Sequence, residues 1–172
     1  MLKDDSRKHL EKYWQLSVDR FRAADFALAA FFAITLIEEV GKVVILENAS
    51  LGVEMDRNGF YSHPEKYIYA VGRTLLVNSR ITRVYGKEEA RFAAWFREKE
   101  LFKIRNRALY MELKGMDLVV PEKAIQRGDS MLLVCIAGEV YAEIQGRSAG
   151  TGSEEWQRIL AEVDAFRTIT GR

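Results

Sequence analysis

Apolar residues recur every three or four positions along most of this chain, which is the spacing of one face of an α-helix. Together with capping and breaking residues, this pattern predicts helices over about 4–21, 25–50, 64–85, 87–113, 121–145 and 153–168. Pro64 and Pro121 each stand at a predicted helix start, where proline is tolerated. Residues 51–62 and 146–152 are predicted loops, and residues 118–120 are the one strand candidate.

These segments predict an all-α fold, an up-and-down bundle of five or six helices, in a single domain over residues 1–172. A chain of 172 residues can bury a sizeable core without disulfides or metals. The longest apolar run, 26–37, is short of the roughly 20 residues that span a bilayer, so it predicts a buried helix. The charged N-terminus does not resemble a secretory signal, and we expect a cytoplasmic protein without membrane association.

Composition narrows the function mainly by exclusion. The 26 Lys+Arg and 25 Asp+Glu leave a net charge of +1, so any site for a polyanion must be a local patch. The lone cysteine, Cys135, lies among apolar residues and is predicted to be a small buried hydrophobe. The two histidines, His9 and His63, are far apart in the sequence, and no Cys/His ligand set exists. We therefore predict no metal and no cofactor.

Charged residues interrupt the apolar face of the second predicted helix. Glu38 and Lys42 are four residues apart among apolar neighbours, which predicts an ion pair between them, and Glu39 extends the acidic cluster. A structural ion pair is the simplest interpretation. Gly41 in the middle of this helix predicts the close approach of a neighbouring helix, since glycine otherwise destabilises a helix.

Polar residues also interrupt the fourth predicted helix. Arg105 and Asn106 lie at the edge of its packing face, and Tyr110 lies one turn beyond Asn106. The arrangement concentrates one cation and two polar groups at one place. Spacing alone favours a structural role for them, because such combinations arise by chance.

Three segments, taken together in this order and spacing, resemble the AbiV family of abortive-infection proteins, within the HEPN superfamily. They are Ile37–Lys42 (IEEVGK), His63–Lys66 (HPEK) and Arg105–Tyr110 (RNRALY), and the resemblance spans about residues 25–120. The resemblance implies a helical bundle that usually acts as a dimer. It also implies a role in bacterial antiphage defence, in which infected cells stop growing.

The resemblance also implies a candidate site. HEPN ribonucleases carry an Arg, frequently followed by Asn or another polar residue, and a His four to six positions beyond the Arg. Arg105 and Asn106 match this pattern, but Tyr110 stands where the His is expected. A tyrosine phenol keeps its proton at neutral pH, so it is a poor general base but can donate a proton. His63 is the other source of an imidazole, if the preceding loop folds over Arg105.

Two classes of function follow from these residues, with a structural helical adaptor as a third. The first is a toxin of HEPN type that acts on RNA or the translation machinery. If it cleaves RNA without a metal ion, the candidate catalytic residues are Arg105, Asn106, Tyr110 and His63. The second is a non-catalytic module that binds a nucleotide, RNA or protein. Its candidate binding residues are Glu38, Glu39, Lys42, Lys66 and Arg107, together with His63 and Arg105. In either class we expect a homodimer, with an antitoxin or phage protein as a further candidate partner.

Overall fold

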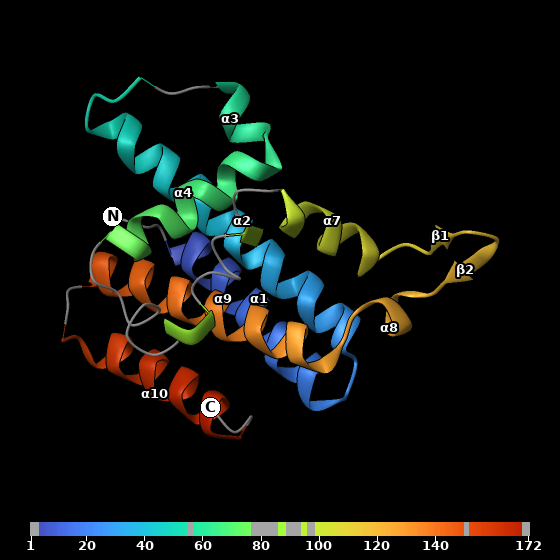
Figure 1. The fold of residues 1–172 in the computed structure, drawn as a ribbon. Helices are drawn as coiled ribbons and strands as arrows, with labels where there is room; N and C mark the ends of the chain where they lie inside the picture. The colour runs from blue at the N-terminus through green and yellow to red at the C-terminus, as the bar shows by residue number, and fades with distance from the viewer. Residues whose placement is uncertain are drawn as a thin grey trace.

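The apolar spacing of the sequence corresponds to α-helix over most of the residues that the computed structural model describes, which are 4–54, 57–76, 86–88, 94–95, 99–149 and 152–169. The elements in chain order are α1 (Asp4–Arg22), α2 (Phe26–Ser50), α3 (Arg57–Tyr61), α4 (His63–Leu76), the 3₁₀ turn η1 (Gly86–Glu88), α7 (Glu100–Arg107), β1 (Glu112–Lys114), β2 (Asp117–Val119), α8 (Pro121–Ala124), α9 (Arg127–Ala149) and α10 (Glu154–Ile169) (Figure 1). The predicted all-α fold is confirmed.

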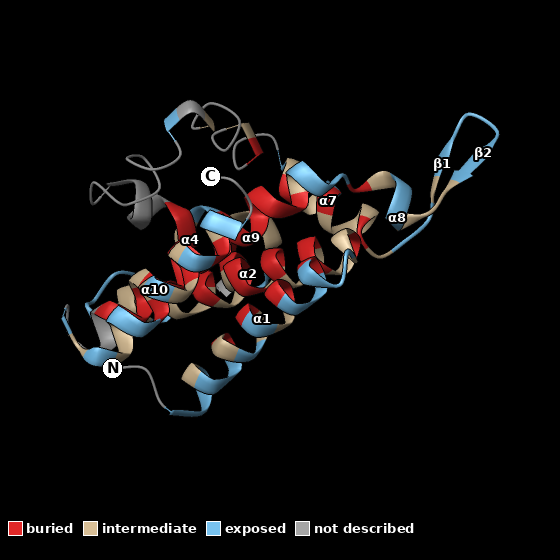
Figure 2. Cartoon of the chain, turned by 90° about the horizontal axis from the view of Figure 1, so that it is seen from below, coloured by how far each residue is buried: buried red, intermediate tan, exposed pale blue. Residues whose placement is uncertain are grey.

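Helices α2 and α9 form the centre of the bundle and are packed against each other, with α1, α4 and α10 around them (Figure 1). Buried residues concentrate on these two helices (Figure 2). The predicted buried run 26–37 lies in α2, and Cys135 in α9 is fully buried, as predicted. Because both helices are apolar on most sides, a charged side chain on either of them faces the interior and needs a partner.

Several helix starts follow the predicted capping signals. The Asp25 carboxylate accepts a hydrogen bond from the Leu28 amide at 3.1 Å, and the Ser153 hydroxyl accepts one from the Trp156 amide at 3.2 Å. Pro121 is the first residue of α8, and Pro64 is the second residue of α4. These side chains fix the ends of α2, α4, α8 and α10.

Two long helices of the sequence prediction are wrong in extent. The helix predicted over 87–113 is interrupted at Lys99, whose φ of 55° is left-handed, and α7 ends at Arg107. The helix predicted over 121–145 is divided at Ile125, whose φ of −107° and ψ of 118° are extended. The predicted loop 51–62 contains the short helix α3. Residues 77–85, 89–93 and 96–98 of the predicted helices lie outside the described residues.

A β-hairpin follows α7 and projects away from the helices (Figure 1). β1 and β2 pair antiparallel, with Leu113 opposite Leu118, and Gly115 supplies a positive φ of 65° in the turn. The sequence predicted a single strand over 118–120; the structure places β2 one residue earlier and adds β1. The hairpin is exposed along most of its length (Figure 2).

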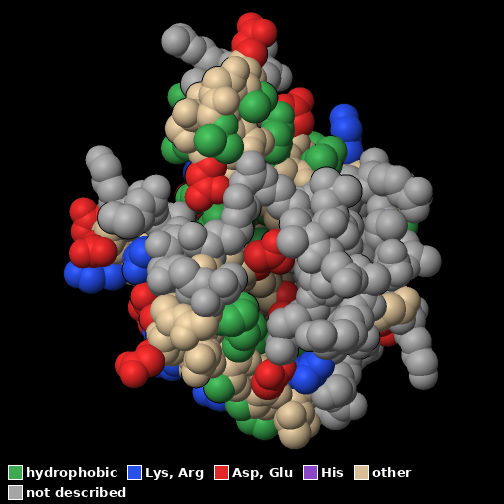
Figure 3. All heavy atoms as spheres, turned by 90° about the vertical axis from the view of Figure 1, so that its left-hand side faces the viewer, with side chains coloured by type: hydrophobic (Ala, Val, Ile, Leu, Met, Phe, Trp, Pro, Cys, Tyr) green, Lys and Arg blue, Asp and Glu red, His purple; other side chains and the backbone are tan. Residues whose placement is uncertain are grey.

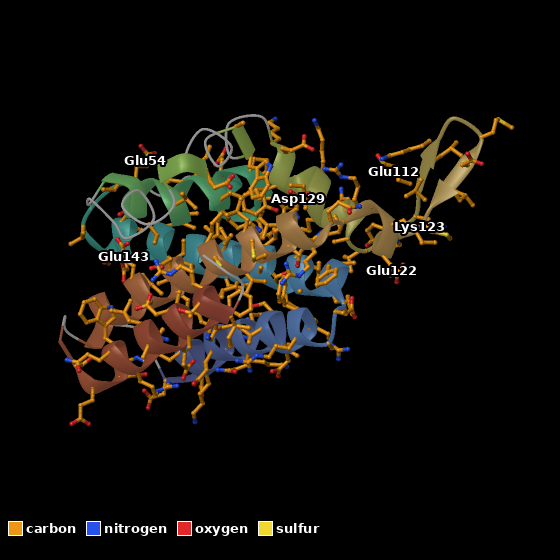
Figure 4. The ribbon with its side chains drawn as sticks, turned by 60° about the horizontal axis from the view of Figure 1, so that its bottom comes forward. Glu54, Glu112, Glu122, Lys123, Asp129 and Glu143 are labelled. Carbon is orange, nitrogen blue, oxygen red and sulfur yellow. The ribbon has the colours of Figure 1, made fainter. Side chains whose placement is uncertain are left out.

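Among the described helices, none has both the length and the apolar character needed to cross a membrane. On the face shown in Figure 3, acidic and basic side chains are interspersed among apolar ones where the surface is coloured. Figure 4 shows that Glu112 lies near α8, with its Glu122 and Lys123, and away from Glu54 and Glu143. The charges of the described surface in these views are therefore distributed in local clusters.

Candidate functional site

A buried carboxylate on α2 is the centre of the main polar cluster. Glu38 is only 4% exposed, and its Oε1 accepts a hydrogen bond from the Tyr67 hydroxyl of α4 at 2.6 Å. Tyr67 is itself 1% exposed. A charge at such depth is tolerated only with hydrogen bonds and opposite charges around it, and α4 and α7 supply these.

Three cationic or titratable nitrogens surround the same carboxylate. His63 Nδ1 lies 2.9 Å and Arg105 Nε 3.4 Å from Glu38 Oε1, while Lys66 Nζ lies 3.7 Å from Oε2. Neither His63 Nδ1 nor Arg105 Nε has the geometry of a hydrogen bond, although both atoms are buried. Glu38 thus contributes one negative charge against the two positive charges of Lys66 and Arg105. Among the described residues, the cluster therefore has an excess of positive charge when His63 is counted as neutral.

Aromatic rings hold the two outer members of the cluster. The His63 ring lies against Phe102 of α7 with centroids 5.4 Å apart, and the Arg105 guanidinium lies over the Phe31 ring at 5.4 Å. In the described part of the chain, His63 Nε2 and the terminal Arg105 nitrogens have no hydrogen-bond or ion-pair partner. The His63 and Arg105 side chains are 35% and 22% exposed, so both reach solvent at their outer ends.

The close approach of α2 and α4 depends on Gly41. A Cβ atom at this position would collide with the main-chain oxygen of Lys66 on α4. The contact predicted from the sequence is therefore confirmed. It brings the first turn of α4, with His63, Lys66 and Tyr67, against the turn of α2 that carries Glu38.

The pKa of Tyr67 is raised far above its ordinary value. The main cause is burial of the side chain, followed by the negative charge of Glu38 and then by the hydrogen bond to Glu38. Tyr67→Phe is expected to lower the free energy of unfolding by about 1.5–3 kcal/mol, because the lost hydrogen bond joins a hydroxyl to a carboxylate. Urea denaturation measures this loss.

The same variant should change the pH dependence of stability. Above about pH 10, the unfolded Tyr67 releases its proton while the folded one keeps it, so the stability of the wild type falls as the pH rises from there. This fall should be shallower in Tyr67→Phe. It should not vanish, because burial also raises the pKa of Tyr141. Equal slopes in the two proteins would contradict the role of Tyr67.

The predicted pair of Glu38 and Lys42 is wrong. Lys42 Nζ instead donates to Glu39 Oε1 at 2.6 Å, and His9 of α1 lies 3.7 Å from Glu39 Oε2. The reason is that residues three apart on a helix are also neighbours, and Glu38 is turned toward α4. His9, Glu39 and Lys42 line a separate pocket between α1, α2 and α3, together with Asp5, Ser6, Leu10, Val43, Leu46 and Phe60.

The predicted group of Arg105, Asn106 and Tyr110 does not form one site, because Arg105 and Asn106 face different sides of α7 and Tyr110 lies beyond the end of that helix. Arg105 points to Glu38, whereas Asn106 and Tyr110 line a groove on the outer side, and Tyr110 is 63% exposed. Neighbouring helix positions are about 100° apart, so adjacent residues face different directions. Arg107 lies in the same groove, where its Nη2 donates to Glu100 Oε1 at 2.8 Å.

Sequence reasoning brought His63, Lys66, Arg105 and Glu38 forward, and the structure places them in one cluster. It did not identify Tyr67 as a polar member of this cluster. The available signal was that a buried tyrosine hydroxyl usually needs a hydrogen-bond partner. Among the described residues, no group of three or more His, Cys, Asp or Glu side chains is arranged to hold a metal ion.

Comparison with known proteins identifies one family. The sequence model of the AbiV family, a HEPN group, matches residues 3–142, which run from the start of α1 into the second half of α9. The matched range includes every residue of the Glu38 cluster and of the outer groove of α7. No curated protein and no solved structure matches this chain.

Proposed function

The chain belongs to the AbiV family of HEPN-type abortive-infection proteins, and on this premise we propose that it is a defence effector that cleaves RNA without a metal ion. The observation that supports the proposal is that His63 and Arg105, from different helices, lie against the same buried carboxylate of Glu38. This arrangement supplies the imidazole that is missing at Tyr110. One proton-transfer group and one guanidinium are then available at the solvent end of a rigid cluster.

His63 is the general base of the proposed reaction. A carboxylate beside Nδ1 favours the tautomer that carries its proton there, which leaves Nε2 able to accept a proton. Packing against Phe102 fixes the plane of the ring. Glu38 is then a positioning residue, since it acts on the substrate only through His63.

Arg105 binds the scissile phosphate in this proposal. A ribose 2′-hydroxyl gives its proton to His63 Nε2 and its oxygen bonds to phosphorus, while the bond from phosphorus to the 5′-oxygen breaks. The leaving 5′-oxygen takes a proton from water, the hydroxide that remains takes up the proton held by His63, and the products are a 2′,3′-cyclic phosphate and a 5′-hydroxyl. The terminal nitrogens of Arg105 stabilise the extra negative charge of the phosphate as it forms.

The remaining predicted residues take other roles in the proposal. Lys66 adds positive charge from within the cluster, and the outer groove with Asn106, Arg107 and Tyr110 contacts RNA away from the cleaved bond. A binding role for Glu39 and Lys42 stays a prediction. We further propose a cytoplasmic homodimer of single-domain chains, directed at RNA or a ribosome-associated target and controlled by an antitoxin or phage protein.

A non-catalytic binding module is the second candidate, and the excess of positive charge around Glu38 favours it. Such a cluster suits an anionic group whether or not a bond is cleaved. The two candidates differ in the RNA ends. Only cleavage by a 2′-hydroxyl leaves cyclic phosphates.

Arg105→Lys is expected to lose RNA cleavage by about 100-fold, nearly as much as Arg105→Ala, because lysine cannot donate two parallel hydrogen bonds to one phosphate. The measurements are growth arrest on induced expression in bacteria and sequencing of the RNA ends. Arg167→Lys is the matched control. Arg167 has the same 22% side-chain exposure as Arg105 and pairs with an acid, Asp164, at 3.0 Å, but it lies on α10.

Thermal melts accompany each Arg105 variant, since Arg105 also contacts Glu38. The lysine variant keeps a positive charge beside the carboxylate and should stay folded. A folded Arg105→Ala protein that arrests growth as strongly as the wild type would show that the proposed site is wrong. The family membership would then account for the fold alone.

A further inference from the structure

The hairpin of β1 and β2 exposes an apolar face that the helices do not cover. Leu113 and Leu118 are directly opposite each other, so they lie on the same face, and they are 67% and 65% exposed. Met116 in the turn is 97% exposed. A two-stranded hairpin is marginally stable by itself, and its open edges are templates for another strand. The hairpin therefore has the properties of an interaction element.

The register shows which main-chain groups of β1 are available. Gly115 and Met116 form the two-residue turn, so Lys114 and Asp117 are the pair that closes it. Hydrogen-bonded and non-hydrogen-bonded pairs alternate along an antiparallel ladder, so the next pair, Leu113 and Leu118, is not hydrogen-bonded. The N–H and C=O of Leu113 consequently point outward from the free edge of β1.

The sequence of β1 is complementary to itself when it is read in the opposite direction. We propose that β1 pairs antiparallel with β1 of a second copy of this chain, about a twofold axis at Leu113. The two Leu113 residues then exchange both main-chain hydrogen bonds. Glu112 of each copy lies opposite Lys114 of the other, at the non-hydrogen-bonded positions where side chains are closest.

The free edge of β2 does not offer the same match. Pairing β2 with itself about Leu118 would place Asp117 opposite Val119, which leaves the carboxylate without a partner. Pairing through β1 instead gives a four-stranded sheet with Leu118, Leu113 and their two counterparts in one row on one face. Three or more strands with an apolar face are stable where a single hairpin is not.

This inference deepens the homodimer of the proposed function by naming its interface. Glu112 belongs both to β1 and to the lining of the outer groove with Asn106 and Tyr110. Pairing of the hairpins therefore leaves one outer groove beside each end of the new four-stranded sheet. Figure 4 shows Glu112 near the base of the hairpin, where α8 is the adjacent helix.

A charge exchange tests the pairing on the purified full chain by sedimentation, without RNA. Glu112→Lys puts lysine opposite lysine at both positions, and Lys114→Glu puts glutamate opposite glutamate, so each variant should self-associate roughly tenfold more weakly or worse. Mixing the two variants should restore the dimer, because every facing pair is then of opposite charge. The double variant Glu112→Lys/Lys114→Glu should also dimerise like the wild type.

Two proline variants distinguish the edges of the hairpin. Leu113→Pro removes an outward N–H of β1 and should abolish the dimer, while Leu118→Pro removes the matching N–H of β2 and should not. Circular dichroism confirms that both stay helical. A monomeric wild type at micromolar concentration, unchanged association of the charge variants, or loss of the dimer only in Leu118→Pro would overturn the proposal. Since none of these measurements uses RNA or growth, failure here is separate from failure of the proposed activity.

Discussion

His63→Ala is expected to reduce RNA cleavage by about 100-fold to 10,000-fold, the range for loss of a general acid or base. The reason is that His63 is the only histidine at the Glu38 cluster, where its Nδ1 lies 2.9 Å from the carboxylate. The measurement is the yield of RNA with 2′,3′-cyclic phosphate ends from purified protein, together with growth after induction.

The second histidine of the chain provides the matched control. His9 also lies beside a glutamate of α2, at 3.7 Å from Glu39, but on the other side of the helix. His9→Ala should therefore cleave RNA like the wild type. If both histidine variants remain active, proton transfer does not depend on the imidazole at Glu38.

Tyr110 is the alternative source of a proton, and its phenol is 63% exposed in the outer groove. Loss of cleavage with retained RNA binding in Tyr110→Phe would assign proton donation to that hydroxyl. Unchanged cleavage in Tyr110→Phe, combined with loss in His63→Ala, is the result that the geometry favours. These outcomes separate the residue at the usual histidine position from the one that the fold brings to Arg105.

The sequence was sufficient for the helical class and for the central helices, because α2 and α9 carry long apolar stretches and are buried on most sides. Leu132, Ile136, Val140 and Ile144 follow one another at four-residue spacing, and all are buried. The close packing at Gly41 was also predicted, since glycine inside a long helix needs a compensating contact. Here local preference and tertiary packing agree.

The interruptions of the predicted helices had weaker local signals. Lys99 adopts a left-handed conformation although it is neither glycine nor asparagine, the residues that usually do so. The amino-acid type at this position therefore did not indicate that α7 begins after it. The hairpin is too short for alternation to be distinguished from a helix end, since β1 and β2 have three residues each. The sequence prediction continued one helix through Lys99 and the hairpin, and it therefore placed Asn106 and Tyr110 in one site with Arg105. In the structure, Asn106 and Tyr110 lie away from Arg105, in the outer groove.

The partners of Glu38 were not predictable from spacing within one helix. The i,i+4 rule offered Lys42, but a buried carboxylate is paired by whatever donors the neighbouring helices bring to it. Three of the Glu38 partners, His63, Lys66 and Tyr67, come from α4, and their position depends on the contact at Gly41. Long-range packing therefore decided the chemistry of the site, while short-range pairing decided that of Glu39.

Glu38→Ala is expected to lower the free energy of unfolding by about 3–5 kcal/mol. The carboxylate is the acceptor of the Tyr67 hydroxyl and the nearest counter-charge of Lys66, whose side chain is only 5% exposed. Removing it leaves a buried ammonium without compensation. Urea denaturation of the purified variants measures the change.

Two neighbouring substitutions are the controls for this loss. Lys42→Met and Glu39→Ala break an ion pair whose side chains are 32% and 21% exposed, so each should cost about 1 kcal/mol or less. Lys42 does not contact Glu38, and the difference between the variants is therefore electrostatic as well as a matter of packing. Equal stability of Glu38→Ala, Lys42→Met and the wild type would show that water solvates the Glu38 cluster, and a site built on a rigid buried carboxylate would no longer hold.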